Sequence, residues 1–504
     1  MNKSQKSILN AMAALLNMAV TSVVGLVLGR TILSSYGSEY NGINSTITQI
    51  VNTIMVLEGG FTLASNVALF QPFAQKDYNT INGILSATKK RFMSVGGIAF
   101  IVGIIIALIY PLTVSSSMPY IEFVMLMLTV LIPSCFNLGV NMKHRCVLLT
   151  DQKEYIISLS SSITYTIGNL VAIMVMRMGA SLVIARIVIM ISLLANYIFI
   201  GIYCRLKYNF IDYSVEPAYD KIKGTRNVIA LKLTSIAYTT LPIITISMIP
   251  ESGALLASIY AVYKSIISMV KNCLSSITNA PRLGFGALLA EGREDDAKRL
   301  FGQYELITNL GICIILGTTC LLIMPFVDIY TKGINDANYH DVMLASIMLT
   351  TAYLETLHIP SGQIIQMSGR FKASRNIQSA ACVLLVVTLI VGGVTSGLYG
   401  IVTSTLIAAS FLAVAEIGYV RTRIFKNHFV ELLKNAVPSC VICVGCCAIG
   451  FSNLIKVGTY FEFIIAGIIS VIIITIISTL IYYVINREQF LNTLTLLRQI
   501  IKKK

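Results

Sequence analysis

The chain has 504 residues, of which 56% are hydrophobic and 12% are charged, and its mean hydropathy is +0.78. Soluble domains carry roughly 25% charged residues, so this sequence has too little polar surface for a soluble fold and too much apolar sequence for a disordered chain. Many apolar runs reach the roughly 20 residues that a membrane-spanning helix needs, which predicts a polytopic membrane protein.

The formal net charge of +15 comes from 38 Lys and Arg against 23 Asp and Glu. In a soluble protein such an excess could indicate a nucleic-acid partner. Here the basic residues fall in short loops between apolar runs, which is typical of the cytoplasmic loops of membrane proteins. We therefore expect no nucleic-acid partner, and membrane lipids as the surroundings of the chain.

Taken in chain order, the apolar runs predict an all-α protein with fourteen transmembrane helices. The second run is longer than a bilayer requires, and we expect it to project or to bend at Gly59-Gly60. The predicted spans are 8–29, 41–72, 92–112, 119–140, 156–176, 181–204, 227–249, 254–281, 302–326, 342–367, 377–393, 398–420, 432–452 and 461–485.

The loops alternate strongly in basic charge. With the N-terminus inside, the internal segments hold 30 Lys and Arg, and the external segments hold 4. Lys and Arg are enriched on the cytoplasmic side of membrane proteins. The sequence therefore predicts that both termini are cytoplasmic, and the alternation agrees with an even number of crossings.

Short sequence matches recur at offsets of 216 to 218 residues and predict two copies of one six-helix unit. An even number of helices gives both copies the same orientation, related by an axis along the membrane normal. The matches are Gly37 with Gly253, 74–77 with 290–293, Gln152 with Gly369, and Gly179 with Gly397. The predicted organisation is an N-terminal lobe (1–206), a cytoplasmic linker (207–226), a C-terminal lobe (227–424), and two further spans with a basic tail (425–504).

Motifs for enzymatic chemistry are missing from the sequence. It contains no Gly-Lys dipeptide and hence no Walker A motif, and its four histidines form no HExxH. The cysteines 440, 443, 446 and 447 have cluster-like spacing, but they lie in an apolar span without charge to balance a metal, and we interpret them as packing residues. We predict a protein that is not an enzyme and holds no resident cofactor.

Basic residues inside the predicted spans are the strongest functional signal, because a charge at mid-bilayer costs at least ~2.5–3.5 kcal/mol. Lys264 and Lys271 flank the middle of the eighth span, on one helix face and about 10.5 Å apart along the axis. We expect that face to border a water-filled cavity. Lys232, Arg186 and Arg30 lie nearer span ends and are candidates for the same role, with snorkelling to lipid headgroups as the alternative.

Two acidic residues also fall within predicted spans, Glu58 in the second and Glu355 in the tenth. Each is interpreted either as the partner of a lysine or as a site for a coupling H⁺ or Na⁺. Glu305 and Glu416 lie nearer the cytoplasmic ends and are interpreted as interfacial. A wet, cationic cavity between the lobes suits an anionic substrate, and paired lysines suit phosphate or pyrophosphate.

With these features the chain resembles the Wzx-type O-antigen and capsule flippases, the polysaccharide-transporter family of the multidrug/oligosaccharidyl-lipid/polysaccharide (MOP) exporter superfamily. The resemblance covers almost the whole chain. It rests on the six-plus-six-plus-two layout, on the segment from Lys6 to Gly37 with its Gly29-Arg30, and on the sequence LLTDQK at 148–153.

This resemblance implies movement of undecaprenyl-pyrophosphate-linked oligosaccharides from the inner to the outer leaflet of a bacterial plasma membrane by alternating access. It implies that cationic cavity residues hold the pyrophosphate or acidic sugars, a role that Lys264 and Lys271 match by location. Spans 13 and 14 are then expected to form a groove for the polyprenyl tail. A polysaccharide polymerase and glycosyltransferases are the functional partners that the family implies.

Two other functions are compatible with the layout. A multidrug or metabolite antiporter of the same superfamily would favour an acidic cavity, whereas the mid-membrane excess here is basic. A non-transporting membrane scaffold for envelope assembly would need no charged cavity at all.

Overall fold

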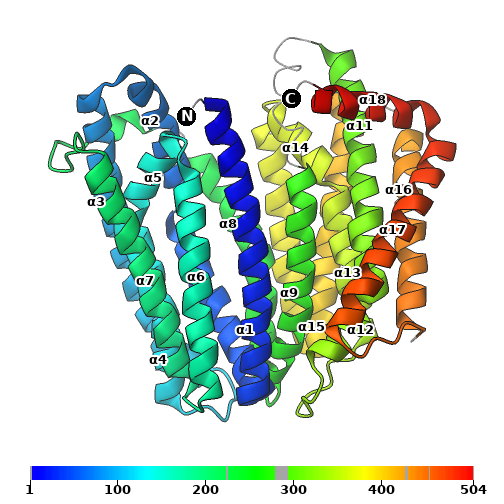
Figure 1. Ribbon diagram of the computed structural model, residues 1–504, viewed down its shortest axis with the longest axis horizontal. Coiled ribbons are helices and arrows are strands. Elements are labelled where there is room, and N and C mark those ends of the chain that lie inside the picture. Colours follow the sequence, from blue (N-terminus) through cyan, green and yellow to red (C-terminus); the bar gives the residue numbers. More distant parts are fainter. Residues whose placement is uncertain are drawn as a thin grey trace. The chain divides into compact units, whose positions relative to one another are not determined.

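The computed structural model describes residues 3–58, 60–222, 225–278, 293–425, 429–452 and 454–502, and for residues 3–4, 7–8, 57, 63, 225–233, 235, 276–278, 294, 429–431 and 496–502 it describes the backbone alone. Within these ranges all regular structure is helical (Figure 1). The chain forms two compact units, Met1–Ser258 and Ile259–Lys504. This division falls inside the helix α9 (Gly253–Thr278), and the predicted lobe boundary at 207–226 stays a prediction.

The described residues contain fourteen apolar helical segments that could cross a membrane, as predicted. In the part of the chain that the structure describes, eleven helices are long and apolar enough to span a membrane. Two of them, α1 (Lys3–Ile54) and α15 (Phe371–Tyr419), each contain a break at a glycine and so supply two crossings. The shorter apolar helix α8 (Thr225–Ser247) completes the set.

The two breaks are sharp reversals of the chain, made at single glycines. Gly37 has φ 87° and Gly397 has φ 56°, a region that L-residues with a side chain rarely adopt. In α15 the two halves then lie back to back. A Cβ on Gly392 would lie 2.5 Å from the carbonyl oxygen of Gly400, so only glycine allows this approach.

Unit 1 contains the first crossings and is built around one continuous apolar core. The predicted bend in the second span is present: α1 ends at Ile54, a 3₁₀ turn covers Met55–Glu58, and a new helix begins at Phe61. The remaining helices are α2 (Phe61–Gln75), α3 (Tyr78–Ile109), α4 (Tyr120–Phe136), α5 (Met142–Thr150), α6 (Glu154–Arg177) and α7 (Leu182–Lys207). A π-helical turn at Asn137–Asn141 joins α4 and α5 into one crossing.

Unit 2 begins at Ile259 inside α9. It also has a π-helical turn, at Ile312–Leu316, which joins α11 and α12 into the ninth crossing, whereas the π-helical turn of unit 1 lies in the fourth. The helices are α11 (Glu294–Gly311), α12 (Gly317–Tyr330), α13 (Val342–Leu357), α14 (Ile359–Met367), α15, α16 (Phe429–Phe451), α17 (Tyr460–Ile485) and α18 (Arg487–Lys502). The last of these follows the fourteenth crossing and packs on α11.

The backbone supports the predicted internal repeat at two of its four matches. Gln152 and Gly369 both have positive φ, 56° and 75°, directly after equivalent helices. Gly179 and Gly397 likewise have φ of 85° and 56°. The match at 290–293 lies largely outside the described residues.

The outer surfaces of both units are apolar, as a lipid environment requires. Large exposed aliphatic side chains follow one another along the helices. Examples are Ile101, Ile105 and Ile109 on α3, Val383, Val387 and Ile390 on α15, and Ile468, Ile472 and Ile476 on α17. The protein is therefore a multi-pass membrane protein.

Candidate functional site

The polar residues of α9 gather on one face of that helix. Ser265, Ser268 and Asn272 are exposed, and Lys264 and Lys271 are half-buried beside them. The residues of the opposite face, among them Tyr263, Ile267 and Leu274, are buried. Hydroxyl, amide and ammonium groups are costly to place against lipid hydrocarbon, so this polar face of α9 is poorly suited to contact lipid.

The two lysines of this face have different surroundings, both within unit 2. Lys271 Nζ lies 2.6 Å from Glu355 Oε2 of α13. The lysine side chain is 37% exposed and the glutamate 14%. Lys264 Nζ lies 5.6 Å from the centroid of the Tyr260 ring, within the range of a cation–π interaction. Glu355 is thus the partner of a lysine, while Lys271 keeps part of its surface open to a ligand.

The predicted residues of unit 1 lie on other helices. Arg186 of α7 donates from Nε to Asn44 Oδ1 of α1 at 2.6 Å, and from Nη2 to the same oxygen. Arg30 is half-buried on the first half of α1. Glu58 Oε1 accepts a hydrogen bond from Thr62 N at 3.0 Å and so caps α2. Lys232 belongs to α8, but its side chain lies outside the described residues.

Two buried acid–base pairs of unit 2 are absent from the sequence-based site. His358 Nδ1 lies 2.8 Å from Glu416 Oε2 of α15, and Arg421 contacts Glu305 of α11. Both carboxylates are buried within the protein, and their location near the cytoplasmic membrane interface stays a prediction. Burial of a charge demands a partner, but the partners are 58 and 116 residues away in sequence, and no local pattern indicates them.

The motif at 148–153 forms a junction between helix ends in unit 1. Asp151 receives hydrogen bonds from Lys6 Nζ of α1 at 3.2 Å and from the Tyr208 hydroxyl after α7 at 2.6 Å. Its second charged partner is Lys153 Nζ at 2.6 Å. Burial alone would raise the pKa of the Asp151 carboxyl, but these hydrogen bonds outweigh it and hold the pKa below its usual value. The carboxylate therefore stays charged and ties three helices together.

A seam of hydroxyl and amide groups joins α6 to its neighbours. Ser162 Oγ donates to Asn17 Oδ1 at 2.9 Å, which links α6 to α1. On the other side of α6, Asn196 Nδ2 of α7 donates to Ser161 Oγ at 3.2 Å. Interhelical hydrogen bonds of this kind are a common means of helix association in membranes. We interpret the seam as structural.

The cysteine-rich segment lies on α16. Cys440 is exposed, and Cys443 and Cys446 are buried. Among the described residues, no group of three or more His, Cys, Asp and Glu side chains could hold a metal ion.

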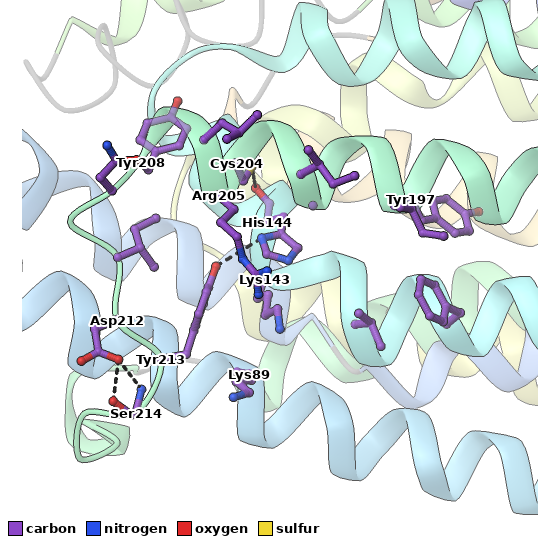
Figure 2. Close-up of a pocket in the computed structure, with 18 residues that line it drawn as sticks. Lys89, Lys143, His144, Tyr197, Cys204, Arg205, Tyr208, Asp212, Tyr213 and Ser214 are labelled. Carbon is purple, nitrogen blue, oxygen red and sulfur yellow. Dashed lines mark hydrogen bonds between the residues drawn. The ribbon is translucent and has the colours of Figure 1, made fainter.

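A cavity of about 900 Å³ lies in unit 1, between α3, α5, α7 and the chain that follows α7 (Figure 2). Three basic side chains line it, Lys89, Lys143 and Arg205, together with Tyr213. Figure 2 shows the three cations grouped beside the Tyr213 ring. In the sequence, all three belong to the positive excess of the predicted internal segments. No sequence signal indicated their convergence, because they come from three helices.

Among the comparisons with known proteins, only the comparison with solved structures finds matches, and these identify the fold. No family model matches the chain, and no curated protein does. Solved structures do match. An inward-facing multidrug resistance MATE family transporter of the MOP superfamily has a TM-score of 0.65 and 14% identity, over 82% of this chain and 98% of that one. The MATE multidrug transporter DinF-BH has a TM-score of 0.60 and 14% identity, over 85% and 98%.

A third match is a MOP superfamily transporter from Pyrococcus furiosus, described as having a binding pocket of reverse polarity. Its TM-score is 0.56 at 13% identity, over 85% of this chain and 98% of that one. These likenesses show that the chain has the fold of the MATE transporters of the MOP superfamily. The fold implied by the sequence resemblance is confirmed, and membership of the MOP superfamily and of its Wzx-type family stays a prediction.

Proposed function

We propose that the protein is a flippase that moves lipid-linked oligosaccharides, carried on undecaprenyl pyrophosphate, from the inner to the outer leaflet by alternating access. The observation that carries the proposal is the polar face of α9, where Lys264 and Lys271 stand beside exposed Ser265, Ser268 and Asn272. Two ammonium groups on an open helix face suit a pyrophosphate, which they bind as point charges.

The remaining predicted residues take secondary roles in this proposal. Arg186, Arg30 and Lys232 of unit 1 are proposed as further cationic contacts for acidic parts of the cargo. Glu355 would set the charge of Lys271, and Glu355 and Glu58 are two separate candidates for a coupling H⁺ or Na⁺ site. The Lys271–Glu355 pair supports this role because protonation of the carboxylate would free the lysine for an anion.

The test is transport of a fluorescent lipid-linked oligosaccharide in proteoliposomes with imposed H⁺ or Na⁺ gradients. The double variant Lys264→Ala and Lys271→Ala should lose at least tenfold in flipping rate, because the head group loses both ammonium groups. Its matched control is Lys90→Ala with Arg91→Ala, which removes the same charge from exposed positions of α3 in unit 1. Wild-type flipping by the α9 double variant would remove the proposed site.

Truncation of Lys271 also leaves Glu355 without its lysine, which could reduce transport by itself. The triple variant with Glu355→Gln removes that uncompensated charge. Flipping should stay low in the triple variant if the lysines bind cargo. Recovery of transport in the triple variant would show that the lysines serve only to neutralise Glu355.

A multidrug antiporter is the second candidate, because two of the matched structures are described as multidrug transporters. The antiporter, unlike the flippase, is expected to transport cationic compounds. Cation-driven efflux of ethidium, unaffected by the α9 lysine variants and without any flipping of the lipid-linked sugar, would favour the antiporter. Absence of both activities would favour a scaffold.

A further inference from the structure

We infer that the cavity of Figure 2 binds the phosphate group of an anionic lipid from the adjoining membrane leaflet. The inference concerns unit 1 alone and does not depend on which cargo the protein moves. Its elements are a cluster of cations, a fixed rim and an apolar wall.

The cations of the cavity converge on one aromatic ring. Lys143 Nζ lies 4.8 Å from the Tyr213 ring centroid, and Lys89 Nζ lies 5.8 Å from it. Arg205 lies in the last turn of α7, in the same cavity. Three positive charges held this close repel one another unless an anion joins them.

Carboxylates do not fill this role in the described part of the chain. No ion pair within 4.0 Å is formed there by Lys89, Lys143 or Arg205. Asp212 also lines the cavity, but its Oδ1 accepts hydrogen bonds from Ser214 N at 2.8 Å and from the Ser214 hydroxyl. Those hydrogen bonds, and to a lesser extent the charge of Lys89, lower the pKa of the Asp212 carboxyl, so one carboxylate faces three cations.

The rim of the cavity is held in place before any ligand binds. Asn82 of α3 donates to the Phe210 carbonyl at 3.0 Å and accepts from Asp212 N at 3.1 Å. Ser86 donates to the Tyr213 carbonyl at 3.3 Å, and the Tyr213 hydroxyl lies 3.2 Å from His144 Nδ1. Because the Tyr213 ring is fixed from both ends, the cations around it keep their positions, which favours binding.

The cavity continues from the cations onto apolar surface. Its lining includes Val140, Ile198 and Ile202, which are 40%, 52% and 54% exposed. The two isoleucines lie about one turn apart on α7, on the surface that faces hydrocarbon in a membrane protein. A free phosphate would not use this wall, whereas a lipid places its phosphate on the cations and its chain along the isoleucines. Basic pockets at the ends of transmembrane helices are a known type of lipid-headgroup site.

The first experiment measures binding of phosphatidylglycerol to the purified full-length protein by native mass spectrometry. The variant Lys89→Gln, Lys143→Gln and Arg205→Gln should bind at least tenfold more weakly than the wild type. The control Lys90→Gln, Arg91→Gln and Lys207→Gln removes three exposed charges from α3 and α7 outside the cavity, and its affinity should change less than twofold. Equal losses in the two variants overturn the proposal.

A second variant tests the apolar wall without changing any charge. Ile202→Trp should fill the cavity and weaken phosphatidylglycerol binding about tenfold, while Ile191→Trp, exposed on the same helix outside the cavity, should not. This pair keeps the proposal testable if the triple variant fails to fold. Wild-type lipid binding by Ile202→Trp overturns it.

A comparison of ligands shows whether the bound phosphate comes from a membrane lipid, a polyprenyl carrier or a free anion. Phosphatidylglycerol and undecaprenyl phosphate are compared with phosphatidylcholine and with inorganic pyrophosphate. Tighter binding of either anionic lipid supports the proposal and identifies the source as membrane lipid or polyprenyl carrier. Pyrophosphate binding as tight as that of the lipids, or phosphatidylcholine binding as tight as that of phosphatidylglycerol, overturns it.

Discussion

Lys271, His358 and Arg421 each meet a carboxylate inside unit 2, and each pair joins helices that are far apart in sequence. Lys271 pairs with Glu355 across 84 residues, and the His358–Glu416 and Arg421–Glu305 pairs span 58 and 116. The sequence predicted one of these pairings as an option, since Glu355 was a candidate lysine partner. The other two pairings had no sequence signal, because burial and ion pairing depend on which helices pack together.

The His358–Glu416 pair depends on the lack of a side chain at residue 362. A Cβ on Gly362 would overlap Glu416 Oε2. Gly362→Ala should therefore push the carboxylate off His358 and destabilise the protein by about 1–3 kcal/mol, the usual cost of overpacking a core. The measurement is the midpoint of thermal unfolding, followed by circular dichroism in detergent, and the expected change is a fall of several degrees.

The same substitution at Gly418 is the control. That position is in the same helix as Glu416, and a Cβ there meets no atom within 4 Å. Gly418→Ala should leave the midpoint unchanged or raise it, because alanine favours helix. An equal fall for both variants would show that the loss comes from helix flexibility and not from the buried pair.

At the scale of the element, α9 is an amphipathic helix in an apolar protein. The sequence predicted its polar face from the spacing of Lys264 and Lys271, because helical periodicity is a local property. The structure adds three exposed polar side chains to that face, Ser265, Ser268 and Asn272. These small residues carried no sequence signal of their own, since serine is also common at helix contacts in membranes.

If the polar face of α9 borders water, a thiol placed on it should react with a charged, water-soluble reagent. We expect Ser268→Cys to be labelled at least tenfold faster than Ile468→Cys, which is 57% exposed on the apolar surface of α17. Only thiolates in contact with water react with such reagents. The measurement is peptide mapping by mass spectrometry after timed labelling, which separates the new thiol from the native cysteines.

Similar rates at the two positions would place both thiols in the same environment. In that case the α9 face would lie against lipid, and the proposed cargo site would be wrong. Labelling of Ser268→Cys that slows in the presence of a lipid-linked pyrophosphate would support the proposed function further.

At the scale of the whole chain, the layout of crossings was the most secure inference. Fourteen apolar runs became fourteen crossings, even where a single glycine joins two of them. The repeat gains support from positive φ at Gln152, Gly369, Gly179 and Gly397. The orientation in the membrane rests on the distribution of Lys and Arg and stays a prediction.

That orientation predicts a cytoplasmic C-terminus, since basic loops resist translocation. Green fluorescent protein fused after Lys504 should be fluorescent, and alkaline phosphatase fused there should be inactive in a bacterial host. Phosphatase fused after Asp336, in the predicted external loop between the ninth and tenth spans, should be active. The reverse pattern would invert the topology and would place the cavity of unit 1 in the outer leaflet.

The sequence by itself determined the class, the crossings and the polar face of α9, because these depend on local composition and helical period. In hydrocarbon the backbone must satisfy its own hydrogen bonds, so each long apolar run becomes a helix whatever its neighbours are. Only the tertiary structure decided which charges meet. Lys271 with Glu355, His358 with Glu416, and the Lys89, Lys143 and Arg205 cluster depend on which helices pack together, and long-range packing leaves no periodic signal in the chain.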